Sequence, residues 1–363
     1  MTRGAVVSCL AIVVHAVALI GAQMATVDRV QSPGWWPTKG TAPRADYIGA
    51  AACAECHPSQ SRSQPTTAMA RTAMRARDSA VLREHRRLSM TSGAYHYEIV
   101  TTDEGSVYSV KDGSRAADAS LVWAFGDGKT GQSFLFEKDG ALHEARVSYY
   151  ETGHALDFTP GRRLEAPRDL DEAMARRISD LELRRCFACH ATAPVAGGTL
   201  DLAAAIPGIG CEACHGPGRS HVEAMHDRRM AEGRKAILNP AKLPPAESVD
   251  FCGACHATFW DITLANEKGN TALRSEPFRL ASSRCWQTRD ARLRCTACHN
   301  PHQPLVRDVG AYDSKCLACH TAPAGRVCTV GTARCAGCHM PKFEVPELHR
   351  SFTDHFIRIV RER

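Results

Sequence analysis

The sequence contains few aromatic residues for its length: Phe, Trp and Tyr account for 6% of its 363 residues. A chain this long can form two or three ordinary domains, but so few aromatic side chains leave little material for conventional cores. Long basic runs are also missing, since the densest basic clusters are pairs such as Arg86–Arg87 and Arg184–Arg185. The formal net charge of +6 therefore does not indicate binding to nucleic acid.

Cysteine, in contrast, is plentiful and follows one pattern. Fourteen of the 17 Cys residues occur in seven copies of the pentapeptide Cys-x-x-Cys-His, which we number motif 1 to motif 7 in chain order. The Cys pairs are Cys53 and Cys56, Cys186 and Cys189, Cys211 and Cys214, Cys252 and Cys255, Cys295 and Cys298, Cys316 and Cys319, and Cys335 and Cys338. The His residues that follow them are His57, His190, His215, His256, His299, His320 and His339. Composition predicts on the order of 0.04 copies by chance, so the pattern indicates a shared chemical role.

Each copy has the form of a c-type haem attachment site. Its two thiols bond covalently to the porphyrin, and its His becomes the proximal ligand of the iron. The alternative for a single copy is a zinc knuckle or a disulfide pair, but zinc ligands show variable His placement and paired half-sites. The sequence therefore predicts a multihaem cytochrome c with seven covalently bound haems. Haem also compensates for the scarce aromatic residues, because a porphyrin is a large apolar body around which side chains pack.

The basic residues have a possible role in such a protein. Arg outnumbers Lys 36 to 9, and Arg is suited to bidentate contacts with the carboxylates of haem propionates. A GC-rich genome that favours Arg codons is the alternative reason for this excess. We expect redox proteins, and not nucleic acid, as partners.

The N-terminal segment predicts export. Arg3 precedes an apolar run from Ala5 to Ala22, which is typical of a secretory signal peptide. Because haem is attached covalently outside the cytoplasmic membrane, we expect a periplasmic or cell-surface protein. We favour a cleaved signal peptide over residues 1–25. An uncleaved anchor is the alternative, and it would allow peripheral or anchored association with a membrane.

The rest of the chain divides into segments that differ in apolar patterning and in haem motifs, and together they predict an α+β fold. We expect a linker at 26–46, a first haem segment at 47–92, an antiparallel β meander of about five strands at 93–165, and a six-haem domain at 166–363. Alternating apolar residues and Asp-Gly turns, such as Asp139-Gly140, predict the small antiparallel sheet. Apolar spacing predicts a helix over 168–185. Motifs 2 to 7 start 25, 41, 43, 21 and 19 residues apart, which indicates a haem-packed region of short helices and loops rather than a solenoid.

The sixth iron ligands determine whether each haem is closed or open to small molecules. Outside the leader and the motifs the chain has nine His, so every iron has a potential second imidazole. The candidate distal ligands are His221, His302, His349, His355, His154 and Met69. His302 is three residues beyond His299 and cannot fold back onto the same iron, so we expect it to bind a neighbouring haem.

Other residues are given more ordinary interpretations. We interpret His85, His96, His143 and His226 as surface or strand residues. Met69 as a packing residue is the alternative to its role as a ligand. Asp354 is a candidate to orient an imidazole through its second nitrogen. Whether Cys285 and Cys328 form a disulfide is left open, because sequence alone does not establish the geometry.

At these residues the chain resembles a family of multihaem cytochromes related to the tetrahaem cytochrome c-554/c-prime of ammonia oxidisers, a branch often fused to tetratricopeptide repeats. The resemblance implies an exported redox protein with haems packed closely enough for electron hopping. In that family the related tetrahaem carrier accepts electrons from a hydroxylamine-oxidising enzyme. The similar segments are Tyr47–Gly49 with Cys53–His57, Thr67–Arg71, Val147–Tyr150, Pro160–Gly161, Ile209–His221, Asn239–Leu243, Cys295–His302, Cys335–Lys342 and Phe352–Ile357.

Three functions compete. We favour an electron carrier that connects respiratory partners through closely packed haems. The second is an enzyme that acts on nitrite or hydroxylamine at an open haem. The Cys-x-x-Cys-Lys motif of pentahaem nitrite reductases is missing, and nothing in the sequence marks Tyr312, the one Tyr after Tyr150, as a haem-crosslinking residue. The third is a haem subunit of a membrane-bound redox complex, which an uncleaved anchor would favour.

Overall fold

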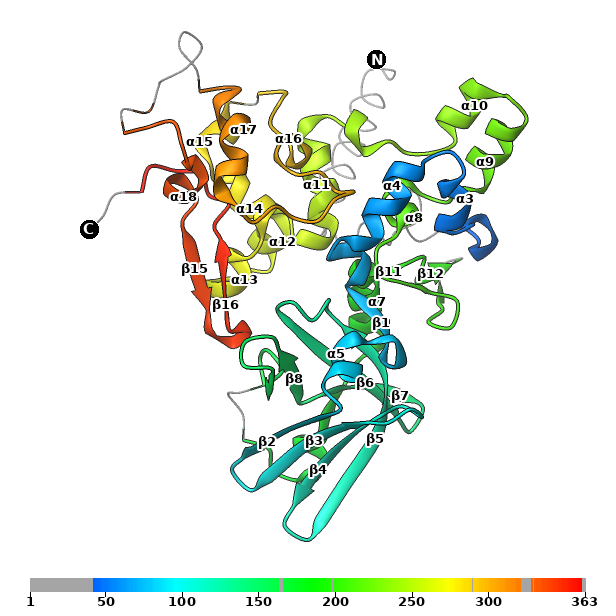
Figure 1. The fold of residues 1–363 in the computed structure, drawn as a ribbon, viewed down its shortest axis with the longest axis vertical. Coiled ribbons are helices and arrows are strands. Elements are labelled where there is room, and N and C mark those ends of the chain that lie inside the picture. The colour runs from blue at the N-terminus through cyan, green and yellow to red at the C-terminus, as the bar shows by residue number, and fades with distance from the viewer. Residues whose placement is uncertain are drawn as a thin grey trace, which may run out of the picture.

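The computed structural model describes residues 42–162, 166–196, 199–288, 290–320, 328 and 330–360. The predicted signal peptide and most of the predicted linker lie outside the described residues. Figure 1 shows a large sheet at one end of the molecule and many short helices at the other. We call residues 73–205 the sheet region and residues 206–360 the motif region, which carries motifs 3 to 7. None of the described helices is long and apolar enough to cross a membrane.

The predicted antiparallel sheet is present, but it is larger than expected. It has ten strands, with the main path β10-β7-β6-β5-β4-β3-β2, and β1, β8 and β9 attached to it. A register shift between Leu121 and Trp123 interrupts the pairing of β5 with β6, where the sheet curls. The strands are β1 (Ala73–Arg75), β2 (Arg87–Ser92), β3 (Tyr95–Thr101), β4 (Ser106–Asp112), β5 (Arg115–Phe125), β6 (Gly131–Lys138), β7 (Ala141–Ala145), β8 (Val147–Tyr150), β9 (Ala155–Phe158) and β10 (Ala175–Arg177).

The sheet encloses its own apolar core. Alternating residues of β3, β4 and β6 point to one face, as the period of two requires, and the side chains on that face are buried. Tyr108, Phe134 and Phe136 are each 0% exposed, and Trp123 is 2% exposed. Asp139 and Gly140 both have positive φ at the β6–β7 hairpin, which is the geometry that Asp-Gly turns supply. The hairpins and alternating strands of this sheet therefore follow local patterns in the sequence.

The single helix expected over 168–185 is wrong. The segment forms α6 (Leu170–Met174), then β10, and then α7 (Asp180–His190). β10 pairs with β7, and Arg176 forms ion pairs with Glu144 at 3.0 Å and Glu182 at 2.6 Å. Ser179 then starts α7 with a capping box. Tertiary pairing with a distant strand thus overrides the local helical spacing.

The other helices are short and are joined by loops and small ladders. They are α3 (Ala50–Ala54), α4 (Pro58–Ser63), α5 (Ala80–Glu84), α8 (Cys211–His215), α9 (Arg219–His226), α10 (Met230–Lys235), α11 (Pro245–His256), α12 (Phe259–Leu264), α13 (Gly269–Leu273), α14 (Glu276–Ala281), α15 (Arg284–Gln287), α16 (Cys295–Cys298), α17 (Asp313–Leu317) and α18 (Cys335–His339). The 3-10 turns are η1 (Arg44–Asp46), η2 (Gln64–Thr66), η3 (Met69–Arg71), η4 (Ala76–Asp78), η5 (Pro240–Lys242), η6 (Val309–Tyr312) and η7 (Pro346–Leu348). The two-stranded ladders are β11 (Ala191–Thr192) with β14 (Ile206–Pro207), β12 (Val195–Ala196) with β13 (Thr199–Leu200), and β15 (Lys342–Val345) with β16 (Arg350–Thr353). The chain is therefore mixed α and β.

Buried apolar side chains gather in the sheet region. One cluster consists of buried residues that lie between Ala76 and Met174 in the sequence. A second consists of buried residues between Trp123 and Ala205. Within the described part of the motif region, no such cluster forms. The buried apolar residues there are Ile209, Ala213, Ala224, Val249, Ala254, Ile262, Ala336 and Val345. The motif region thus has scattered contacts where the sheet region has a core.

Candidate haem sites

The motifs lie on short helices or at their ends. Motifs 3 and 7 coincide with α8 and α18, motifs 2 and 4 end α7 and α11, and motif 5 begins with α16. The backbone closes one helical turn across the motif, as when His299 N donates to Cys295 O at 2.9 Å. Residues i, i+3 and i+4 share one face of a helix, so both thiols and the imidazole of a motif point to the same side. This is the arrangement that one flat porphyrin requires.

Three of the motif imidazoles are held by main-chain carbonyls. In each, Nδ1–H donates to a carbonyl oxygen from a distant part of the chain, which leaves Nε2 as the nitrogen to bind iron. The pairs are His190 to Thr72 at 2.9 Å, His215 to Leu238 at 2.8 Å, and His339 to Arg358 at 2.9 Å. Burial also lowers the pKa of His190, which favours the neutral form that coordinates a metal. These residues fit the proximal role.

His256 of motif 4 differs from these three. Its Nδ1 lies 3.2 Å from Oε2 of Glu276, so a carboxylate takes the place of the carbonyl. This hydrogen bond raises the pKa of His256 to about 9. Glu276 is 20 residues beyond His256 and belongs to no motif, so nothing in the sequence indicated it.

Two candidate distal residues lie opposite motif imidazoles. The rings of His302 and His215 have centroids 6.0 Å apart and planes inclined by 7°, and those of His355 and His299 have centroids 6.2 Å apart. An iron held by two imidazoles separates their centroids by roughly 6 Å, because each nitrogen lies about 2 Å from the metal. Both separations therefore leave room for one iron. Burial, and then the neighbouring His215, lowers the pKa of His302.

The other candidates are placed without such a pairing. His221 donates through Nδ1 to Gly233 O at 2.7 Å, which resembles the three carbonyl-held proximal residues. His154 contacts the Tyr149 hydroxyl through Nδ1 at 2.9 Å. His349 uses Nε2, the usual ligating nitrogen, to bind Asp157 at 2.8 Å. Met69 is half-buried in η3. Their roles as distal ligands stay predictions.

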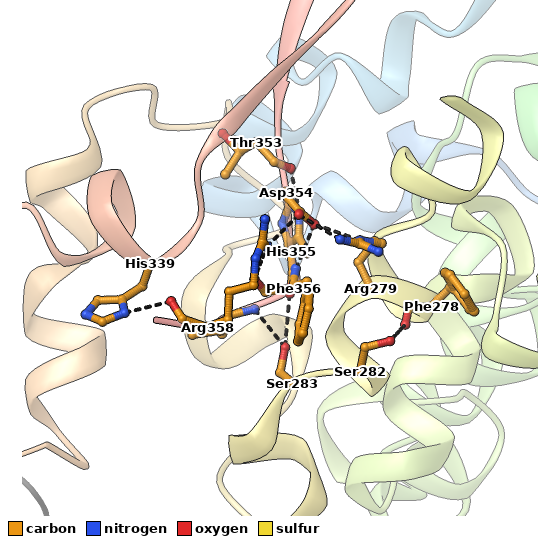
Figure 2. A network of polar contacts seen from close by, with 11 residues as sticks. Phe278, Arg279, Ser282, Ser283, His339, Thr353, Asp354, His355, Phe356 and Arg358 are labelled. Carbon is orange, nitrogen blue, oxygen red and sulfur yellow. Dashed lines mark hydrogen bonds and ion pairs between the residues drawn. The ribbon is translucent and has the colours of Figure 1, made fainter. Parts of the chain in front are cut away.

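The expectation that Asp354 orients an imidazole is wrong. Its carboxylate accepts two hydrogen bonds from Arg279, at 2.8 and 2.7 Å, and one from Arg358 at 2.7 Å (Figure 2). Nδ1 of His355 donates to Thr353 O instead, at 3.1 Å. The buried carboxylate thus fixes the C-terminal segment, whose Arg358 carbonyl holds His339. Two guanidinium groups satisfy it better than one imidazole could.

Thiols of different motifs lie close together. Cys53 of motif 1 is near enough to Cys211 of motif 3 that their interaction raises the pKa of Cys53 and lowers that of Cys211 to about 7. Cys252 of motif 4 and Cys295 of motif 5 affect each other's pKa in the same way, and Cys335 of motif 7 affects that of Cys316 of motif 6. Cys189 of motif 2 also donates a hydrogen bond to Ala254 O of motif 4 at 3.5 Å. Haems attached at these thiols would lie with their edges close together.

The structure bears on two alternatives that the sequence raised: a disulfide between the unassigned cysteines, and zinc binding by the motifs. Cys285 and Cys328 are free thiols, so no disulfide joins them. In the part of the chain that the structure describes, no three His, Cys, Asp or Glu side chains converge into a site for a single metal ion. Each motif instead presents two thiols and one imidazole along a helical face, which suits a large flat group.

The comparisons with known proteins agree with this chemistry. Residues 143–216, from β7 through motifs 2 and 3, match the family model of cytochrome c554 and c-prime. A search of curated proteins and a search of solved structures gave no match. The chain is therefore related to this cytochrome family, as its resemblance to that family implied. The match supports a c-type cytochrome with covalently bound haem iron and a role in electron transfer.

Proposed function

We propose that this protein is an exported, periplasmic or cell-surface multihaem cytochrome that binds seven c-type haems and passes electrons between respiratory redox partners. The observation that carries the proposal is the closeness of the motifs to one another. Electron hopping requires neighbouring cofactors with close edges, and the thiols that would bear the porphyrins lie near enough to affect one another's pKa across motifs 1 and 3, 4 and 5, and 6 and 7.

Weaker links connect these pairs into one series. Cys214 of motif 3 lies close enough to Cys252 of motif 4 to affect its pKa, and Cys298 of motif 5 affects that of Cys316 in motif 6. Motif 2 joins at motif 4 through Cys189. The proposed electron path therefore runs through motifs 1, 3, 4, 5, 6 and 7, with motif 2 as a branch.

The distal residues favour a carrier over an enzyme. His302 and His355 would close the irons held by His215 and His299, and a closed iron exchanges electrons without binding substrate. The alternative of hydroxylamine oxidation would involve Tyr312. Its ring packs edge-on against His299 at 5.6 Å, but its hydroxyl donates to Val306 O at 2.8 Å. The tyrosine thus has a packing role in the structure.

Arg side chains are part of the proposal as partners of the haem propionates. Arg274 is exposed within the motif region and lies over the Phe352 ring at 5.0 Å. A propionate at this surface would accept a charge-assisted hydrogen bond from its guanidinium group. Arg274 is therefore our candidate for such a contact.

The test measures how many irons are open. Reduced protein should bind carbon monoxide at no more than one haem per chain, because a closed iron must first break an axial bond. The protein should also pass electrons rapidly to an artificial acceptor. Reduction should spread over a broad range of potential, since neighbouring charged sites shift one another's midpoints. Turnover of nitrite or hydroxylamine at roughly 1–1000 per second would contradict the carrier and favour an enzyme.

A further inference from the structure

The imidazole of motif 4 has a hydrogen-bond partner of a different kind from the partners of the imidazoles in motifs 2, 3 and 7. Glu276 Oε2 accepts from His256 Nδ1 at 3.2 Å, whereas main-chain carbonyls serve His190, His215 and His339. A carboxylate is a stronger acceptor than a carbonyl, and it makes a ligating imidazole more basic. A more basic axial ligand stabilises ferric over ferrous iron, which lowers the reduction potential.

The position of Glu276 is fixed by the surrounding structure. It is the first residue of α14, and Arg279, one turn further along the helix, makes the two hydrogen bonds to Asp354 that Figure 2 shows. Asp354 is 3% exposed, so this ion pair anchors α14 against the C-terminal segment. The helix that carries Glu276 is thus fixed by a buried ion pair, although the bond between Glu276 and His256 is itself partly exposed.

We propose that Glu276 is a positioning residue that holds down the reduction potential of the haem attached at Cys252 and Cys255. The inference rests on the proposed function, because it requires a haem at motif 4 with His256 as its proximal ligand. Within the electron path, motif 4 lies beside motif 5, whose Cys295 affects the pKa of Cys252, and it contacts motif 2 through Cys189. A low-potential haem at this junction would stay oxidised while its neighbours are reduced, and would separate the electrons stored on its two sides.

The test is Glu276→Gln in the full-length, haem-loaded protein, followed by a spectroelectrochemical titration. An amide oxygen still accepts from His256 but carries no charge, so one one-electron component should move to higher potential. We expect roughly a tenfold change in its reduction equilibrium, which corresponds to about 59 mV for one electron. One ferric haem signal in the electron paramagnetic resonance spectrum should change with it, and the other signals should stay as in the parent.

Two further variants separate tuning from a structural effect. Glu276→Asp keeps the carboxylate but shortens its reach, so its shift should have the same sign and be smaller. Glu247→Gln removes the same charge from exposed residue 247 on α11, the helix that ends in His256, and should move the titration least.

The outcomes distinguish the inference from the function on which it rests. A Glu276→Gln protein with all haems attached and an unchanged titration would overturn the role of Glu276. Equal shifts in the Gln and Asp variants would also overturn it, because they would indicate a structural disturbance. Peptide mass spectrometry of the parent without haem on Cys252 and Cys255 would overturn the proposed function at motif 4 itself.

Discussion

The two regions of the molecule achieve order by different means. In the sheet region, large side chains such as Trp123, Phe134 and Phe136 are buried against one another around paired strands. In the described part of the motif region, short helices carry five motifs, and the buried apolar side chains are few and none is aromatic. The core of the sheet region is stabilised by its own side chains, whereas the motif region needs an additional apolar group.

The difference indicates what haem contributes besides electron transfer. Five porphyrins attached to the motif region would supply the large apolar surfaces that its buried side chains lack. Burial of apolar area is the main stabilising contribution to folding, so the cofactors would replace a core there. The sheet region should then depend little on haem, and the motif region should depend on it strongly.

The largest expected effect follows from withholding haem. Residues 26–363 produced in the cytoplasm should carry almost no covalent haem, because attachment occurs after export. Hydrogen exchange should then show protected amides in β3 to β6 and rapid exchange throughout the described part of the motif region. The exported, haem-loaded protein is the control, with both regions protected. Equal protection of both regions without haem would contradict the comparison.

The core of the sheet region should be sensitive to a cavity. Phe136 is 0% exposed and packs against Tyr108 and His143. Phe136→Ala should lower the free energy of unfolding of the sheet region by about 3–5 kcal/mol, because it removes apolar contacts and leaves a cavity. Denaturant titration followed by far-ultraviolet circular dichroism measures it. Val107→Ala, on the same sheet but 40% exposed, is the matched control and should change stability little.

A change at one distal ligand should be local to one haem. His302→Ala should convert about one haem to the high-spin form, because it removes the imidazole opposite His215. The other haem signals and the sheet should be unaffected. His96→Ala, in β3, is the control and should leave the spin state unchanged. A His302→Ala spectrum identical to that of the parent would remove His302 from the distal ligands.

The smallest expected effect is at the N-cap of α7, a helix that lies within the sheet region. Ser179 caps α7, the helix that ends in motif 2, and its hydroxyl accepts from Glu182 N at 3.3 Å. Ser179→Ala should reduce stability by about 1 kcal/mol, as loss of an N-cap usually does. Thermal unfolding of the haem-loaded protein measures this loss, and Ser179→Asp, which also caps a helix, should restore most of it.

Local patterns predicted much of this molecule. The haem motifs, the Asp-Gly hairpins and the alternating strands each lie within a few residues of sequence, so their structure could be predicted before any fold was known. β1 and β10 could not, because they join the sheet by pairing with β5 and β7 across many residues. The break in the expected helix at Arg176 has the same cause, since Glu144 lies on a distant strand.

The candidate haem sites also have one part that the sequence predicts and another that it does not. Proximal residues follow from the spacing of each motif, but the partner of a distal residue does not. The sequence placed His302 near a neighbouring haem without indicating which one, and the structure sets it opposite His215, 87 positions earlier. Nothing in the sequence indicated a role for Glu276, because a single Glu outside a motif looks like an ordinary surface residue. Its contact with His256 depends on the fold.

The account depends most directly on how many haems the chain carries. Intact mass spectrometry of the exported protein, denatured so that only covalent groups remain, measures that number. We predict the mass of the polypeptide plus seven haems, one for each motif. A chain that carries four haems or fewer would contradict the account, because most of the motif region would then lack the cofactors proposed to order it.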